Sequence, residues 1–173
     1  DQPRSRGLGD VYKRQEMSMY SIAIDGPAGA GKSTIAKAIA EDIGFIYVDT
    51  GAMYRAMALY FLRSNISNED EQAISRASEN VEITIQYENG EQQVFLNGEN
   101  VSGEIRKEEV GNMASKTSGY GQVRKKLVEL QQQLAKKADV VMDGRDIGTV
   151  VLPDAQVKVY LLSLIHISEP TRP

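Results

Sequence analysis

The residues whose types and spacing are most clearly suited to chemistry form the run GPAGAGKS at 26–33, which has the spacing GxxxxGK[ST]. The run follows a short apolar segment at 20–25 and precedes the helix-forming segment STIAKAIAEDIG. A loop between a strand tip and a helix start directs several backbone N–H groups at one point, an arrangement that binds phosphate. The flanking elements disfavour an ordinary glycine-rich turn, so the run predicts a nucleoside triphosphate as ligand.

Each residue type in this loop suits phosphate binding. Glycines leave the backbone amides uncovered and adopt angles that other residues resist. The lysine reaches the terminal phosphates as a point charge, and the serine hydroxyl can bind Mg²⁺. We therefore predict Lys32 as a catalytic cation and Ser33 as a metal ligand. The predicted phosphate-binding residues are Gly26, Pro27, Ala28, Gly29, Ala30, Gly31, Lys32, Ser33 and Thr34.

The composition restricts the class of protein. The chain has 173 residues, of which 41% are hydrophobic and 25% charged, with a net charge of −4 and no cysteine. Disulfides and cysteine-ligated metals are thereby excluded, and the mild acidity argues against a nucleic-acid partner. No apolar run approaches the roughly 20 residues that span a bilayer, and residues 1–16 lack the apolar core of a secretion signal. We expect a cytoplasmic, monomeric protein without a membrane partner.

Apolar, β-branched runs alternate with helix-forming segments, an order typical of a parallel α/β sheet. The first strand, the phosphate loop, a helix ending near Gly44 and the second strand form a βαβ unit. Further helices are predicted at 52–62 and from a capping box, formed by Ser67 and Asp70, to Glu79. Another helix is predicted where apolar residues recur at helical spacing and form a stripe. That stripe, read as core, consists of Val123, Leu127, Leu130 and Leu134. The four predicted parallel strands are 20–25, 45–49, 138–143 and 156–162.

A different pattern interrupts this order. VEITIQY at 81–87 alternates, which places every second residue from Val81 to Tyr87 on one face. Asn89-Gly90 and Asn97-Gly98 then predict two tight hairpin turns. Residues 81 to about 105 are therefore predicted to form an antiparallel meander, inserted as a small lobe. Three short strands need helices to pack against.

Three further segments narrow the class of phosphate-loop protein: DTGAMYR at 49–55, VSGEIR at 101–106 and DGRDIGT at 143–149. The first and third follow predicted strands, at the sheet edge where parallel α/β proteins bind ligands. Together with DGPAGAGKST they resemble the bacterial cytidylate kinases, which are P-loop nucleoside monophosphate kinases, from about Met19 to Leu161. The resemblance implies a three-layer P-loop α/β fold with a small antiparallel lobe. It also implies transfer of the γ-phosphoryl of ATP to CMP or dCMP, in pyrimidine nucleotide metabolism.

The resemblance also implies roles for individual residues. Arg55 and Arg145 are expected to hold the acceptor phosphate as catalytic cations, because a planar guanidinium matches phosphate oxygens. Cytosine both donates and accepts hydrogen bonds, and a serine, an arginine and an aspartate supply both kinds of partner. Tyr54 is expected to contact the nucleotide, although it could instead belong to the core. The expected contacts to the pyrimidine nucleotide are Thr50, Tyr54, Ser115, Arg124 and Asp146.

Several acidic and basic residues have a structural alternative. Asp143 ends an apolar strand and is the candidate carboxylate on the magnesium side, acting through water. It could instead cap the following turn, as could Asp49. Arg55 could form a structural ion pair, and Arg145 and Asp146 could pair within their loop.

Both ends of the chain depart from the family pattern and resemble translated adaptor sequence. We expect residues 1–16, predicted to be disordered, and residues 163–173 to be non-native. An arginine-rich lid, a last strand and a last helix would then be missing, and activity would be weak or lost. Within the remainder, 17–66 and 139–162 are expected to form the nucleotide-binding core and 67–138 the monophosphate-binding lobe. Two alternatives stay open: a non-catalytic nucleotide-binding fragment, and a P-loop kinase of another acceptor such as shikimate or another monophosphate.

Overall fold

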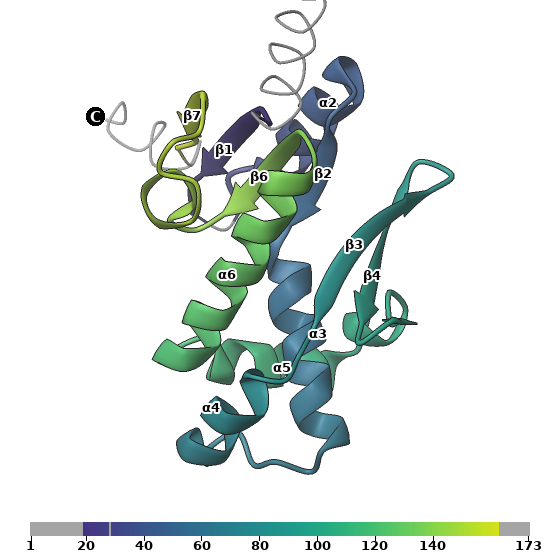
Figure 1. Cartoon of the computed structure of the whole chain (residues 1–173), viewed down its shortest axis with the longest axis vertical. Coiled ribbons are helices and arrows are strands. Elements are labelled where there is room, and N and C mark those ends of the chain that lie inside the picture. The colour runs from purple at the N-terminus through teal and green to yellow at the C-terminus, as the bar shows by residue number, and fades with distance from the viewer. Residues whose placement is uncertain (1–18, 28, 163–173) are drawn as a thin grey trace, which may run out of the picture.

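A four-stranded parallel sheet forms one end of the molecule, in the order β2-β6-β1-β7 (Figure 1). The computed structural model describes residues 19–27 and 29–162, so the predicted extensions 1–16 and 163–173, and Ala28, lie outside the described residues. All four predicted parallel strands are confirmed. They are β1 (Ser21–Asp25), β2 (Ile46–Asp49), β6 (Val140–Gly144) and β7 (Val157–Tyr160).

Helices cover both faces of this sheet. In β1, Ile22 and Ile24 pack against one helix, α2, whereas Ala23 joins a larger apolar cluster with residues of α3 and α6 on the opposite face. Successive side chains of a strand point to opposite faces, which explains why the central strands are apolar throughout. The helices are α2 (Lys32–Ile43), α3 (Thr50–Arg63) and α6 (Gly121–Lys137). The three-layer α/β fold is therefore confirmed.

The inserted meander is also confirmed. Its three antiparallel strands follow the order β3-β4-β5, with bounds β3 (Ile83–Glu88), β4 (Glu91–Leu96) and β5 (Glu99–Asn100). Both predicted turns have positive φ at each central residue, 54° and 78° at Asn89-Gly90 and 49° and 86° at Asn97-Gly98. This is the geometry that a two-residue hairpin loop requires, and it explains why the Asn-Gly signal was reliable.

The β3–β4 hairpin is held against the edge strand of the parallel sheet. The Tyr87 hydroxyl donates to the carbonyl oxygen of Tyr47, and the Asp49 N–H donates to Gln92 Oε1 at 3.2 Å. An edge strand leaves backbone groups unpaired, and these two side chains satisfy part of the β2 edge. The hairpin is thereby fixed beside the strand end at which the candidate site begins.

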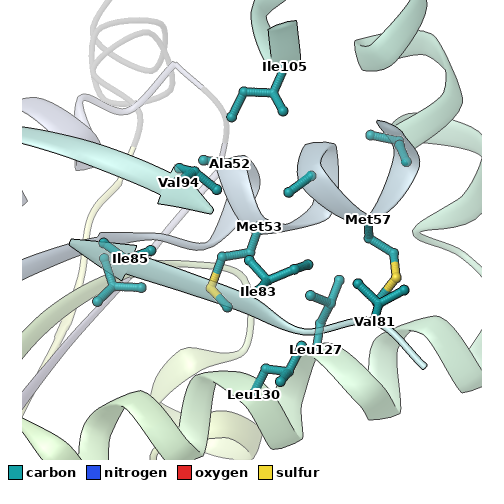
Figure 2. Packing of buried hydrophobic residues seen from close by; sticks show 14 of the residues in the cluster. Ala52, Met53, Met57, Val81, Ile83, Ile85, Val94, Ile105, Leu127 and Leu130 are labelled. Carbon is teal, nitrogen blue, oxygen red and sulfur yellow. The ribbon is translucent and has the colours of Figure 1, made fainter. Parts of the chain in front are cut away.

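The main core lies between α3, α6 and the meander (Figure 2). Met53 and Met57 of α3 meet Ile83 of β3 and Leu127 of α6, and all four are fully buried. Burying such a side chain contributes about 1.5–3 kcal/mol. The predicted stripe of α6 is therefore core, with Leu134 at its margin. One apolar cluster joins sheet and meander, so the division into core and lobe stays a prediction.

One predicted helix start is wrong. The cap of α4 (Glu71–Ser78) is Asp70, whose Oδ1 accepts a hydrogen bond from the Ala73 N–H at 3.1 Å. Ser67 Oγ instead accepts from the Glu69 N–H in the preceding turn. Aspartate is itself a strong N-cap, so the helix begins after Asp70, which the prediction had placed inside the first turn.

Three helical segments were not predicted. Helix α5 (Glu108–Thr117) starts at Lys107, which gives no side-chain cap, and contains a glycine. Its buried residues Val110, Met113, Ala114 and Thr117 nevertheless follow helical spacing. A short 3₁₀ turn, η1 (Glu104–Arg106), precedes it, and a π-helical turn, η2 (Ile147–Val151), follows β6. Among the helices that the structure describes, none has the length and apolar character needed to span a bilayer.

Candidate active site

A cavity of about 1330 Å³ lies at the carboxyl ends of the parallel strands. Its walls come from the phosphate loop after β1, the segments after β2 and β6, and helices α5 and α6. It contains twelve of the residues predicted from sequence: Gly29, Gly31, Lys32, Ser33, Thr50, Tyr54, Arg55, Ser115, Arg124, Asp143, Arg145 and Asp146. Residues from five separate segments of the chain are therefore brought to one place.

Four other predicted residues that the structure describes lie outside this cavity. Gly26 and Pro27 line an adjoining cavity of about 400 Å³, which Arg145 and Asp146 also border. Ala30 and Thr34 line neither cavity, and Thr34 is exposed on the first turn of α2. The structure thus brings together the lysine, serine and arginines, but only part of the loop predicted to hold phosphate.

The phosphate loop has the backbone geometry that its glycines predict. Gly29 and Gly31 have φ values of 82° and 85°, which side chains disfavour, and Gly31 caps α2. The first N–H groups of a helix have no partner within the helix and are available to an anion. Lys32 Nζ donates to the carbonyl oxygen of Pro27 at 3.0 Å. The described part of the loop therefore offers a cation, the Ser33 hydroxyl and the N–H groups at the start of α2.

Both structural alternatives raised for the segment after β2, residues 49–55, are present: Asp49 caps a helix and Arg55 forms an ion pair. Asp49 Oδ1 accepts from the Ala52 N–H at 3.2 Å and so caps α3, while its Oδ2 lies 3.7 Å from Arg55 Nη2. Neither contact removes Arg55 from the cavity, and a guanidinium has five N–H donors. Thr50 Oγ1 donates to the carbonyl oxygen of Asp143 at 2.8 Å, which ties this segment to the end of β6.

Asp143 does not cap a turn but is paired with a buried tyrosine. Its side chain is 5% exposed, and the Tyr47 hydroxyl lies 3.1 Å from each of its carboxylate oxygens. Burial and the Asp49 charge raise the pKa of Asp143 to about 6, although the Tyr47 hydrogen bond and the Lys32 charge act in the opposite direction. The same burial and the nearby carboxylates raise the pKa of Tyr47.

The donor set around Asp143 fits a magnesium ion that is shared with phosphate and water. Asp143, Asp49 and Ser33 all line the cavity, and their oxygen atoms are the ligands that hard cations prefer. Among residues 19–27 and 29–162, no group of three or more acidic, histidine or cysteine side chains forms a metal cluster. The protein alone therefore supplies too few ligands, which matches the habit of Mg²⁺ to bind through one or two carboxylates.

A second polar group lines the same cavity. Arg124 Nη2 is 3.7 Å from Asp146 Oδ2, and both side chains are more than half exposed. Burial raises the pKa of the neighbouring Tyr54, although the charge and hydrogen bond of Arg124 act against that shift. Asp146 has φ 57° and ψ 29°, a left-handed conformation that is costly for a residue with a side chain. A hydrogen-bond donor and an acceptor are thus adjacent in the cavity.

Sequence reasoning missed three residues of this site. Tyr47 and Asp25 act through contacts with distant parts of the chain, at Asp143 and at the start of η2. Gln131 lies on the cavity side of α6 with Arg124, is 2% exposed, and has a side-chain nitrogen without a hydrogen-bond partner among the described residues. The spacing of seven residues between Arg124 and Gln131 could have indicated that Gln131 shares this face.

Comparisons with known proteins agree with this arrangement. Residues 22–168 match the family model described as cytidylate kinase. The cytidylate kinase of Lactobacillus johnsonii is 50% identical over 147 residues, covering 85% of this chain and 64% of the relative. The corresponding values are 52% over 145 residues, 84% and 64% for Caldicellulosiruptor bescii, and 55% over 140 residues, 81% and 60% for Desulfitobacterium hafniense. The chain therefore spans less than two thirds of the length of these relatives, and it belongs to the cytidylate kinase family.

Proposed function

We propose that this chain is the nucleotide-binding part of a phosphotransferase that moves the γ-phosphoryl of ATP to CMP or dCMP. An oxygen of the acceptor phosphate forms a bond to the γ-phosphorus, and the bond from that phosphorus to the β–γ bridging oxygen breaks. The electron pair leaves with ADP, and the products are ADP with CDP or dCDP. The observation that carries the proposal is that Lys32, Arg55 and Arg145 line one cavity.

The chemistry needs positioning and positive charge rather than a protein nucleophile. Phosphoryl transfer passes through a loose transition state whose charge is spread over the phosphoryl oxygens. Lys32 and the amides of the phosphate loop bind the donor phosphates, while Arg55 and Arg145 hold the acceptor phosphate in line. The presence of three cations in a cavity built by a single chain supports this division of roles.

Magnesium is the metal that the proposal requires. Ser33 would bind it directly and Asp143 through water, which agrees with the small number of acidic ligands in the cavity. When bound, the ion neutralises charge on the phosphates and orients them. Asp49 and Asp143 lie close enough for the Asp49 charge to raise the pKa of Asp143, and a cation held by these residues would relieve that repulsion.

The acceptor base is assigned to the polar group formed by Arg124 and Asp146, with Ser115. Asp146 would accept a hydrogen bond from the exocyclic amine of cytosine, whereas Arg124 and Ser115 would donate to its ring nitrogen and carbonyl. The 3.7 Å contact between Arg124 and Asp146 supports a joint role, because a base that bridges them would meet an acceptor and a donor side by side.

The direct test is product formation. The purified chain is mixed with ATP, Mg²⁺ and CMP, and the nucleotides are separated. CDP and ADP in equal amounts are expected, formed slowly because the chain spans only 64% of a relative such as the Lactobacillus johnsonii protein. ADP without CDP would indicate hydrolysis and contradict the proposal. The Lys32→Ala variant controls for contaminating kinases, because it removes the predicted donor-side cation.

A second measurement addresses the acceptor. Thermal unfolding is followed with CMP, dCMP, UMP and AMP, since a ligand that binds the folded state raises the melting temperature. The largest shift is expected with CMP or dCMP. The largest shift with AMP would contradict the assignment of the base.

A further inference from the structure

The carboxylate of Asp25 holds the loop that carries two of the proposed acceptor residues. Asp25 ends β1, and its Oδ1 accepts from the Ile147 N–H at 2.7 Å while its Oδ2 accepts from the Gly148 N–H at 2.9 Å. Arg145 and Asp146 immediately precede these two residues. One side chain therefore fixes the downstream end of the loop.

The upstream end of the same loop is held separately. Thr50 Oγ1 donates to the carbonyl oxygen of Asp143 at 2.8 Å. Only residues 144–146 lie between the two anchors, and Asp146 among them has a left-handed conformation. Such a conformation persists only where the surrounding structure enforces it. The two anchors supply that enforcement.

The position of Asp25 is itself set by the sheet. It pairs with Gly144 of β6 and Tyr160 of β7, and its carbonyl oxygen accepts from the Leu161 N–H at 2.8 Å. The next residue, Gly26, opens the phosphate loop. Hydrogen bonds to a carboxylate are roughly twice as strong as neutral ones. Asp25 therefore joins the phosphate loop to the loop that carries Arg145 and Asp146 through short, strong contacts.

Gly148 provides the space for this contact. A methyl group at Gly148 would lie 3.3 Å from Asp25 Oδ2 and 3.2 Å from Lys158 Cδ, closer than most carbon contacts. Any side chain there would push against the carboxylate. The glycine and the aspartate thus form one unit although they are far apart in sequence.

We infer that Asp25 is a positioning residue that sets Arg145 and Asp146 relative to the phosphate loop. The inference rests on the proposed function, because it assumes that these two side chains bind the acceptor nucleotide. Both are exposed on the cavity wall, so their placement depends on the backbone of the loop rather than on packing. Where catalysis depends on positioning, a displacement of about 1 Å can cost on the order of 100-fold in rate.

The test compares the binding of CMP, on the acceptor side, with the binding of ADP, on the donor side, in the Asp25→Asn variant. The asparagine keeps the shape but presents an NH₂ group to one of the two N–H donors, so at least one hydrogen bond is lost. Calorimetry on the whole chain, well below the melting temperature, measures the dissociation constants of CMP and ADP. The CMP constant is expected to rise about tenfold or more, and the ADP constant by less than about threefold.

The control is Asp70→Ala, which removes a carboxylate-to-N–H contact at the start of α4, away from the cavity. It should lower the melting temperature and leave CMP binding unchanged. A lower melting temperature of Asp25→Asn with unchanged CMP binding would reduce Asp25 to a structural role. Equal weakening of ADP and CMP binding would overturn the assignment to the acceptor side.

Two further measurements keep the inference separate from folding and from the proposed function. If Asp25→Asn does not fold, Gly148→Ala serves instead, and weaker CMP binding with nearly unchanged ADP binding is again expected. The wild-type chain is also titrated with UMP and AMP. Tighter binding of AMP than of CMP would contradict the proposed function, and the comparison of variant with wild type for the preferred monophosphate would still decide the role of Asp25.

Discussion

The Tyr47 hydroxyl lies 3.1 Å from both carboxylate oxygens of Asp143, between two neighbouring parallel strands. Tyr47 pairs with Val141 in the register of β2 and β6, so Asp143 is two residues further along the same face. A buried carboxylate without a donor is costly. The tyrosine therefore explains how an acidic side chain that is 5% exposed is accommodated at the strand end.

We predict that Tyr47→Phe destabilises the protein by about 1–3 kcal/mol at pH 8, because Asp143 is then left buried without this donor. Urea unfolding measures the change. Tyr20→Phe is the control, since the Tyr20 ring is 43% exposed and packs at the margin of the sheet against Phe45. The control should change stability by less than about 0.5 kcal/mol. Equal effects of the two substitutions would show that the hydrogen bond to Asp143 contributes nothing.

A pH dependence follows from the same carboxylate. The pKa of Asp143 in the folded chain is about 6, above its ordinary value of 3.8, so the folded state binds this proton more tightly than the unfolded state. The tighter binding of this proton stabilises the folded state. This stabilisation is fully present below about pH 4 and is lost as the pH rises to about 6, where the buried carboxyl becomes ionised. Asp143→Asn should therefore be more stable than wild type above pH 6.

The measurement is chemical unfolding from pH 4 to pH 8 in magnesium-free buffer. The difference between Asp143→Asn and wild type should grow between about pH 4 and pH 6 and then stay constant. Added Mg²⁺ should stabilise wild type more than the variant above pH 6. Parallel curves for the two proteins over this range would contradict the raised pKa.

Gly144→Ala is predicted to be severely destabilising. A methyl group at this position would lie 3.1 Å from Ile147 Cδ1 and would collide with the Thr50 hydroxyl, which donates to the Asp143 carbonyl oxygen. We expect a loss of about 3 kcal/mol or more, because both neighbours are buried. Gly121→Ala is the control: no atom lies within 4 Å of the added carbon, and alanine favours the helix by up to about 1 kcal/mol. Similar melting temperatures for the two variants would refute the proposed clash.

Most of the fold could be predicted because its signals are local. Apolar runs identified the strands, the Asn-Gly pairs identified the hairpin turns, and parallel strands necessarily share one edge. Helix α5 escaped prediction because Lys107 is a poor cap. Ser67 was mistaken for a cap because serine and aspartate both favour that position.

The residues of the cavity could be placed together for the same reason, but their supporting contacts could not. Asp25 is 122 residues from Ile147, and Tyr47 is 96 residues from Asp143. Contacts over such separations depend on strand register and order, which sequence periodicity does not specify. The roles assigned to the cavity residues stay predictions until the variants are measured.

Asp146→Ala is predicted to reduce the preference for CMP over UMP while leaving ADP binding nearly unchanged. The substitution removes the proposed acceptor for the cytosine amine, and a lost hydrogen bond of this kind costs about tenfold in affinity. Calorimetry with both monophosphates measures the ratio. Asp154→Ala is the control, because Asp154 is exposed and lines neither cavity. An unchanged CMP-to-UMP ratio in Asp146→Ala would show that this residue does not read the base.

Two adjacent glutamines of α6 give the last prediction. The side-chain nitrogen of Gln131 is buried and has no partner among the described residues, whereas Gln132 Nε2 donates to the Val151 carbonyl oxygen at 3.0 Å. Methionine matches glutamine in length and has no donor. Gln131→Met should therefore raise the free energy of unfolding by about 1 kcal/mol, because a buried polar group without a partner is removed.

Gln132→Met should lower the free energy of unfolding by a similar amount, about 1 kcal/mol, because it breaks the hydrogen bond that ties α6 to η2. Urea unfolding of both variants without nucleotide provides the comparison. Helix propensity and side-chain size change equally in the two variants. Gln131 is buried and Gln132 half-buried, so the difference reports on hydrogen bonding together with the burial of the methionine side chain. Destabilisation of Gln131→Met to the same extent as Gln132→Met would mean that the Gln131 amide is already bonded, for instance to an ordered water in the cavity wall.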